Sequence, residues 1–193
     1  MSSEIKVDTI SEKTPTSGVT VDGVLLKDGE VDGVDVSAIT QGITEADQWR
    51  LTANITNTTA DITSNLERND TTGFGYIGTG MTESSGIFTF PSTGKYYIII
   101  SGAQSSGGAS DNFFILKGTT DNSSYSTWIL LDGDNSNASS AEWVSGGSFI
   151  VDVTDTANVK VKLATQHNHS SAILHGSSSY NRTSITFIKL GET

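Results

Sequence analysis

The stretch SSGIFTFPSTGKYYIIISGA, residues 84–103, joins two apolar runs through the turn sequence PSTG. The first run, IFTFP, carries Phe88 and Phe90 and ends at Pro91, which cannot donate a backbone hydrogen bond to a sheet. The second run, YYIII at 96–100, is apolar at every position, so both of its faces are apolar in an extended chain. The stretch therefore predicts two strands, with at least one of the two phenylalanines in a core.

Similar short runs continue to the C-terminus, each bounded by Gly, Asn, Asp or Ser: NFFILKGTT, STWILLDGD, GSFIVDVTD, NVKVKLAT and TSITFIKL. In NVKVKLAT the residues Lys160 and Lys162 alternate with apolar ones, which predicts a strand with one solvent-exposed face. The composition agrees with short strands and many turns, because the chain has 20 glycines and only 17% charged residues. These features predict an all-β fold, an antiparallel β-sandwich or jelly roll.

The run at 96–100 is apolar on both faces, although a strand of a sandwich packs on the opposite sheet with only one face. A partner subunit is the simplest cover for the second face, and the same holds for residues 113–116. The alternative is cover by loops of the same chain. The candidates for a subunit interface are Tyr96, Tyr97, Ile98, Ile99 and Ile100.

The N-terminal part repeats short valine–aspartate units, with VDGV at both 21–24 and 31–34. Each unit supplies one or two apolar residues and a turn, which suits small strands in a stem that cannot close a core alone. A flexible acidic linker is the alternative. For residues 43–55 we favour a strand, with a short helix as the competitor. We expect a stem over residues 1–45 and one folded knob over residues 46–193.

The charge of the chain excludes some partners. Its formal net charge is −11, so phosphate backbones and anionic membrane surfaces would repel it. The chain has no cysteine, which rules out disulfides and thiolate metal sites. The N-terminus lacks a basic region followed by an apolar stretch, and YYIII is too short to span a bilayer. We expect synthesis in the cytoplasm without a signal peptide, no membrane insertion and no nucleic-acid partner.

The sequence GFGYIG at 73–78 fits the dinucleotide-binding pattern G-x-G-x-x-G. Such a turn functions between a strand and a helix, with an acidic residue about twenty positions later. Here a turn-rich segment follows, and the residues about twenty positions later are isoleucines. The glycines are therefore interpreted as turn and close-packing residues, with Phe74 and Tyr76 alternating along a short strand.

The stretch at 84–103 resembles the central signature of the trimeric jelly-roll superfamily that contains the complement globular head and tumour necrosis factor. The pattern G-x-F-x-F-P-x-x-G-x-Y falls on Gly86, Phe88, Phe90, Pro91, Gly94 and Tyr96. The segments SGGSFIVDVTDTANVKVKLAT and SYNRTSITFIKL are similar to a later hairpin and the last strand of that family. The resemblance covers roughly residues 46 to 190 and implies a homotrimer, while the collagen stalk and calcium ligands of the complement branch are absent.

The stem segment IKVDTISEKTPTSGVTVDGVLLKDGEVDGVDVSAI resembles leader segments of virion proteins from tailed bacteriophages, particularly marine ones. The combination implies a virion protein, a trimeric tail fibre, head fibre or spike. In such a protein the N-terminal part would contact other virion proteins and the C-terminal knob would bind a host surface glycan or protein. A head fibre or capsid decoration protein without a receptor role is the alternative, and a polysaccharide-degrading spike is a more remote one.

If the family strand order holds, three loops lie at the end of the knob opposite the C-terminus: QSSGGAS, DGDNSNASSA and QHNHSSAILHGSSS. Small polar side chains with histidine and tryptophan suit adaptable hydrogen bonding to sugars or proteins, and the alternative is plain solvated loops. The candidates for receptor contact are Asp132, Asp134, Asn135, Asn137, Trp143, His167, His169 and His175.

Cofactors and catalysis have little support in the sequence. His167 and His169 form an H-x-H pair that could meet a metal on a threefold axis, but such histidines more often form hydrogen bonds. The segment DGDN at 132–135 lacks the later glutamate of a calcium loop. No spacing singles out a nucleophile with a base or a pair of carboxylates. We expect a protein without metal, cofactor or enzymatic activity.

Overall fold

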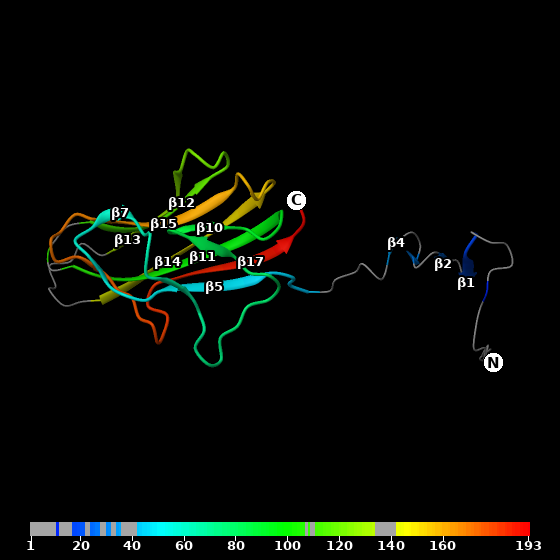
Figure 1. Cartoon of the computed structure of the whole chain (residues 1–193), viewed down its shortest axis with the longest axis horizontal. Helices are drawn as coiled ribbons and strands as arrows, with labels where there is room; N and C mark the ends of the chain where they lie inside the picture. The colour runs from blue at the N-terminus through cyan, green and yellow to red at the C-terminus, as the bar shows by residue number, and fades with distance from the viewer. Residues whose placement is uncertain are drawn as a thin grey trace. The chain divides into compact units, whose positions relative to one another are not determined.

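The computed structural model describes residues 11, 17–21, 24–27, 30–31, 34–35, 42–106, 108, 111–133 and 142–193. The chain divides into two units, Met1–Gly42 and Ile43–Thr193. All regular elements among the described residues are strands, as the sequence predicts (Figure 1). None of the described residues belongs to a helix that could cross a membrane.

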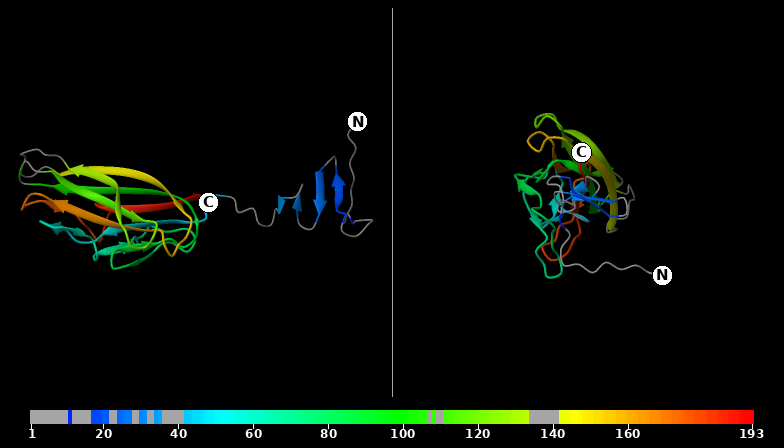
Figure 2. Two further views of the ribbon diagram at one scale, coloured as in Figure 1. Left: turned by 90° about the horizontal axis from the view of Figure 1, so that it is seen from above. Right: turned by 90° about the vertical axis from the view of Figure 1, so that its right-hand side faces the viewer.

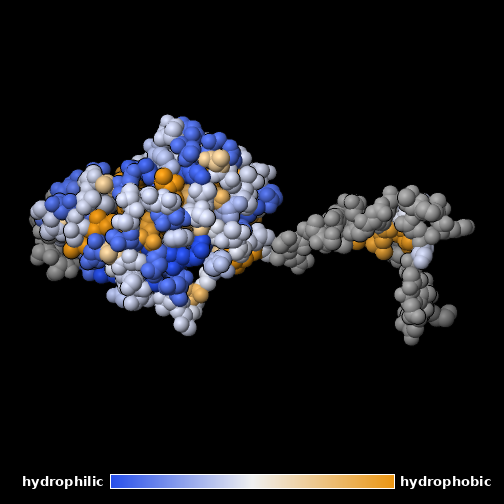
Figure 3. All heavy atoms as spheres, viewed as in Figure 1, coloured by the Kyte–Doolittle hydropathy of each residue, from blue (hydrophilic) through white to orange (hydrophobic). Residues whose placement is uncertain are grey.

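The N-terminal unit contains a meander of short antiparallel strands at the valine–aspartate units (Figure 2). Their bounds are β1 Val19–Val21, β2 Val24–Lys27, β3 Glu30–Val31 and β4 Val34–Asp35. Val24 and Leu26 are 38% and 42% exposed, and apolar atoms of this unit reach its surface in Figure 3. These strands pair with one another but leave apolar side chains uncovered.

The C-terminal unit has two sheets that form a sandwich. The six-stranded sheet has the order β13-β12-β15-β10-β9, and β7 also pairs with β15. Its strands are β7 Thr59–Asp61, β9 Thr82–Ser84, β10 Ile87–Thr89, β12 Asn112–Thr119, β13 Ser126–Gly133 and β15 Lys160–His167.

The seven-stranded sheet has the order β6-β16-β11-β17-β5-β8, and β14 pairs with β11. Its strands are β5 Ala46–Leu51, β6 Ile55–Thr56, β8 Leu66–Arg68, β11 Gly94–Ser105, β14 Glu142–Val153, β16 Ile173–Leu174 and β17 Ser184–Gly191. The long strand β11 lies between β14 and β17, so it is a central strand, as its apolar sequence indicates.

The core lies between the two sheets and contains both phenylalanines of the IFTFP run. Phe88 and Phe90 are 0% and 2% exposed. The ring of Phe88 lies 5.4 Å from that of Trp49 in an edge-on arrangement, and Phe90 lies 4.8 Å from Tyr96. Aromatic pairs at these distances stabilise a core beyond the area they bury.

Alternation along β11 assigns the interface candidates to two different faces. Tyr96, Ile98 and Ile100 are at most 1% exposed and belong to the core of a single subunit, whereas Tyr97 and Ile99 lie on the opposite face and are half-buried. Tyr96, Ile98 and Ile100 are therefore corrected as interface candidates, because a side chain already packed inside one subunit cannot contact another. The same alternation leaves Lys160 and Lys162 of β15 half-buried on its outer face, while Val161 and Leu163 are buried.

Residues 46–51 form a strand rather than a helix. Asp47 and Leu51 are buried. The carboxylate of Asp47 accepts hydrogen bonds from the indole of Trp49 at 2.9 Å and the backbone N–H of Met81 at 2.8 Å, and Arg68 pairs with it at 3.0 Å. A carboxylate with this many donors can be buried without a large penalty, and here it joins β5 to β8 and to the chain before β9.

Candidate functional site

The outer face of the seven-stranded sheet carries a row of apolar residues in register. Ile150 of β14 is paired with Tyr97 of β11, and Tyr97 is paired on its other side with Ile188 of β17. Ile188 is paired with Ala46 of β5, which forms an isolated bridge with Ile77. Directly paired residues point to the same face of a sheet, so these five side chains form one line, called the apolar row below.

The apolar row is open to solvent in the single chain. Ile150 is 58% exposed and Ile77 is 49% exposed, while the three residues between them are half-buried. Four steps between strands at about 4.8 Å make the row roughly 19 Å long. A line of apolar side chains of this length on the outer face of a sheet is a candidate interaction surface.

Polar residues border the apolar row on both sides. Lys95 and Asp152 form an ion pair at 2.9 Å next to it, with both side chains about half exposed. On the other side Gln48 donates a hydrogen bond to Thr186 at 2.7 Å, whereas the apolar Ile99, paired with Ser148, extends the apolar surface. This arrangement of an apolar centre and a polar rim is typical of protein interfaces.

The segment GFGYIG lies at one end of the apolar row, in the loop between β8 and β9. Gly73, Gly78 and Gly80 have positive φ angles, and a Cβ added to Gly78 would lie 2.3 Å from the carbonyl oxygen of Thr44. These glycines therefore serve turns and close approach, as interpreted from the sequence. The short strand expected there is reduced to isolated bridges, and Phe74 and Tyr76 are 44% and 53% exposed.

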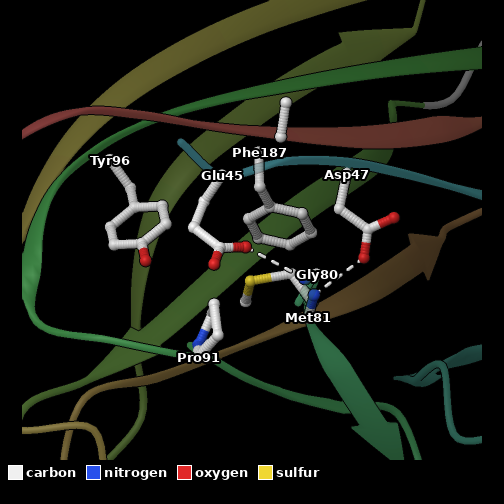
Figure 4. Close-up of a pocket in the computed structure, with 8 residues that line it drawn as sticks. Glu45, Asp47, Gly80, Met81, Pro91, Tyr96 and Phe187 are labelled. Carbon is white, nitrogen blue, oxygen red and sulfur yellow. Dashed lines mark hydrogen bonds between the residues drawn. The ribbon is translucent and has the colours of Figure 1, made fainter. Parts of the chain in front are cut away.

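Two acidic side chains fix the end of this loop (Figure 4). The Glu45 carboxylate accepts hydrogen bonds from the backbone N–H groups of Thr79 at 2.9 Å and Gly80 at 3.0 Å, and Asp47 accepts one from Met81. The pocket that these residues line with Pro91, Tyr96 and Phe187 has no free volume the size of a water molecule. It is a packed junction rather than a ligand site.

A groove of about 250 Å³ lies between the same loop and the sheet. Its walls include Tyr76 and Ile77 from the loop and Ala46, Gln48, Thr186 and Ile188 from the sheet. Three of these residues belong to the apolar row. The guanidinium of Arg68 lies 4.8 Å from the ring centre of Tyr76 and 5.0 Å from that of Trp49, which holds Tyr76 at the wall of the groove.

The loops proposed for receptor contact emerge at one end of the sandwich. β11 ends there at Ser105, β12 begins at Asn112, β13 ends at Gly133 and β15 ends at His167. A Cβ added to Gly108 would lie 2.5 Å from Nε2 of His169, so two of these loops touch. This end is called the loop end below.

The structure separates the receptor-contact candidates into several groups. Asp132 is exposed on β13, and Trp143 on β14 is half-buried with its indole nitrogen enclosed. His167 and His175 are each only 7% exposed, so they present little surface to a partner. His169 is half-buried. The remaining candidates, Asp134, Asn135 and Asn137, lie outside the described residues.

His167 is a structural residue rather than half of an exposed H-x-H pair. Its Nδ1 accepts a hydrogen bond from the backbone N–H of Thr58 at 3.2 Å, and burial lowers the pKa of His167 to about 4. His169 instead has its Nδ1 2.7 Å from the hydroxyl of Ser171. Within the described part of the chain, no three His, Asp or Glu side chains gather as metal ligands.

A polar cluster at the loop end has no signal in the sequence. Nε2 of His175 lies 2.8 Å from the hydroxyl of Ser105 and 3.6 Å from the carboxylate of Glu142, which also pairs with Arg182. Burial and the charge of Arg182 lower the pKa of His175. In a hydrolase triad the acid contacts the histidine nitrogen opposite the nucleophile, whereas here both groups approach Nε2. The cluster joins the strand ends and does not form a triad.

Comparison with known proteins identifies the fold only. No family model and no curated protein matches the chain. The structure of Eiger TNF from S. frugiperda covers 79% of this chain and 96% of its own, at 11% identity and a TM-score of 0.57. Murine APRIL at pH 8.5 covers 76% and 98%, at 9% identity and a TM-score of 0.53.

PRD1 vertex protein P5 covers 78% of this chain and 99% of its own, at 18% identity. Its TM-score is 0.47. The two antiparallel sheets and the likeness to Eiger and APRIL identify the C-terminal unit as a tumour necrosis factor-like jelly roll.

Proposed function

We propose that the chain is a homotrimeric structural protein of a tailed-phage virion, a fibre or spike. Residues 1–45 would attach to other virion proteins, and the knob of residues 46–193 would contact the host surface. The resemblance of the stem to phage leader segments supports the virion role. The resemblance of the knob to a trimeric superfamily supports the assembly state.

The observation that carries the assembly proposal is the apolar row. Ile150 is 58% exposed in the single chain, although it lies within the long strand β14. Covering such a side chain contributes about 1.5–3 kcal/mol relative to leaving it in water. The chain has no cysteine, so disulfides cannot stabilise it, and contacts between copies would replace them.

Contact with the host is proposed for the loop end, where several loops come together on a rigid sandwich. Loops held in this way commonly carry binding residues. The burial of His167 and His175 favours the second candidate function, a head fibre or decoration protein without a receptor. Residues 134–141, which include the candidates Asp134, Asn135 and Asn137, are the segment to test for host contact.

The assembly proposal is tested with a charge placed in the apolar row. We expect Ile150→Asp to convert the trimer to monomers with an unchanged circular dichroism spectrum, because a carboxylate cannot be buried there without a partner. The control is Leu130→Asp, since Leu130 is similarly exposed at 55% but lies on β13 of the other sheet. Native mass spectrometry of both variants measures the number of chains per particle. Trimers of Ile150→Asp as stable as the wild type would contradict the proposal.

A further inference from the structure

Three lysines gather on the outer face of the six-stranded sheet. Lys117 of β12 is directly paired with Lys162 of β15, and Lys160 lies two residues before Lys162 on the same face. Like charges directly opposite each other destabilise a sheet. The carboxylate of Asp61 on β7 offsets part of this repulsion, with one oxygen 2.7 Å from Nζ of Lys117 and the other 2.6 Å from Nζ of Lys162. Three lysines of neighbouring strands therefore share one carboxylate.

The other cations of the described knob have carboxylate partners of their own. They are Arg50, Arg68, Lys95, Arg182 and Lys189. Lys160 differs from them, because its ammonium donates to the hydroxyl of Thr89 at 3.0 Å and forms no ion pair with any carboxylate of the described residues. A chain with a net charge of −11 thus has a local excess of positive charge on this face.

Hydroxyl groups lie beside these lysines in the same strand register. Thr89 of β10 is paired with Lys160, and residues 87 and 162 are paired one pleat further along. Strand β9 continues both rows at the edge of the sheet, where Thr82 and Ser84 are exposed. Directly paired residues share a face. The two rows, called the lysine grid below, are Lys160, Thr89 and Thr82, and Lys162, Ile87 and Ser84.

The surroundings of the lysine grid are acidic on one side only. On the β12 side, Thr119 is paired with Lys160 and donates a hydrogen bond to Asp121 at 2.7 Å. Towards the sheet edge, Glu83 is paired with the buried Phe88 and so lies on the opposite face of β9 from the grid. An anion is therefore repelled on the β12 side and can approach over β10 and β9.

We propose that the lysine grid binds an acidic saccharide, with its carboxylate at the two lysines, its hydroxyl groups at the threonine and serine side chains, and its apolar ring face on Ile87. The inference is independent of the homotrimer and of the host contact at the loop end, because it concerns a different face of a single knob. The ligand carries one carboxylate on an otherwise neutral sugar, since the field of a strongly acidic chain repels a polymer with a charge on every unit.

The lysines have hydrogen-bond donors left for such a ligand. Each ammonium has three N–H groups, and one of them is used by Lys160 on Thr89 and one by Lys162 on Asp61. Hydrogen bonds from an ammonium to a carboxylate are stronger than those between neutral groups. The ring of Tyr125 lies 3.9 Å from Nζ of Lys162 and helps to hold that ammonium in place, so binding orders little of the site.

Saturation-transfer NMR on the full chain tests the ligand class, with sodium glucuronate as the probe. Glucose controls for the sugar ring and sodium acetate for the charge. We expect glucuronate to bind at millimolar concentration, and glucose and acetate at least about tenfold more weakly, because each makes only part of the contacts. Equal binding of acetate would overturn the inference, since charge alone would explain it. Equal binding of glucose, or no binding of glucuronate, would overturn it as well.

The variant Lys160→Gln tests the place of binding. It leaves no acid of the described residues without its partner, so we expect the melting temperature to stay close to that of the wild type. Glucuronate binding should weaken about tenfold, because a charge-assisted hydrogen bond is lost. The matched control is Lys95→Gln, a lysine of the other sheet that pairs with Asp152, and it should bind glucuronate like the wild type. Unchanged binding by Lys160→Gln, or an equal loss in both variants, would place the ligand elsewhere and overturn the inference.

Discussion

At the scale of one residue, truncation of Phe88 tests how much the core contributes to stability. It has no exposed surface and its ring contacts Trp49 and Phe187, each at 5.4 Å. We expect Phe88→Ala to lower the free energy of unfolding by about 3–5 kcal/mol, because it removes a ring and leaves a cavity. The control is Phe74→Ala, since Phe74 is 44% exposed, and it should change stability by less than about 0.5 kcal/mol. Denaturant titration measures both, and equal losses would contradict the assignment.

His167 predicts a dependence of stability on pH. Its pKa is about 4 in the folded chain and 6.5 in the unfolded one, so the unfolded chain takes up the proton first. The neutral buried form is fully stabilising above pH 6.5, and that contribution is lost as the pH falls towards 4. We expect the melting temperature of His167→Gln to fall less over this window than that of the wild type or of His169→Gln. Identical pH profiles of the melting temperature for all three proteins would contradict this role of His167.

The sequence does not predict on which face each residue lies or which distant residues become neighbours. The run at 96–100 correctly predicts apolar side chains on both faces, but not that Tyr96, Ile98 and Ile100 fill the core while Tyr97 and Ile99 face outward. The apolar row joins residues 46, 77, 97, 150 and 188, and only strand register brings them together. The buried His167 has no signal in the sequence, because its partner is the backbone of Thr58.

At the scale of elements, the strands are predicted well because their apolar runs and turn residues are local signals. The likeness to solved jelly rolls confirms the fold class. The loop QHNHSSAILHGSSS is predicted less well, since it contains β16 and the buried residues Ala172 and Leu174. The segment is polar overall, so its composition does not indicate that these two residues are buried. Replacing the whole segment would therefore damage the fold.

The segment 134–141 is the better target for a loop replacement. It connects β13 to β14, and neither strand includes its residues. We expect a Gly/Ser segment of equal length to leave the melting temperature within about 2 °C, because loops tolerate change better than strands. Phage carrying it should adsorb more slowly if this loop contacts the host. Adsorption at the wild-type rate would reject receptor contact here and favour the decoration role.

At the scale of the whole molecule, both units of a single chain leave apolar side chains exposed to solvent. The stem strands expose Val24 and Leu26, and the knob exposes the two ends of the apolar row. Contacts between copies of the chain would cover these exposed apolar side chains, as the proposed homotrimer requires.

The proposed homotrimer is tested by the mass of the native particle. We expect native mass spectrometry of the full chain at micromolar concentration to show three chains per particle, and sedimentation velocity to show a single species of that mass. The proposed association relies on apolar contacts rather than ion pairs, so we expect that high salt does not dissociate the trimer. A stable monomer under these conditions would contradict the proposed homotrimer.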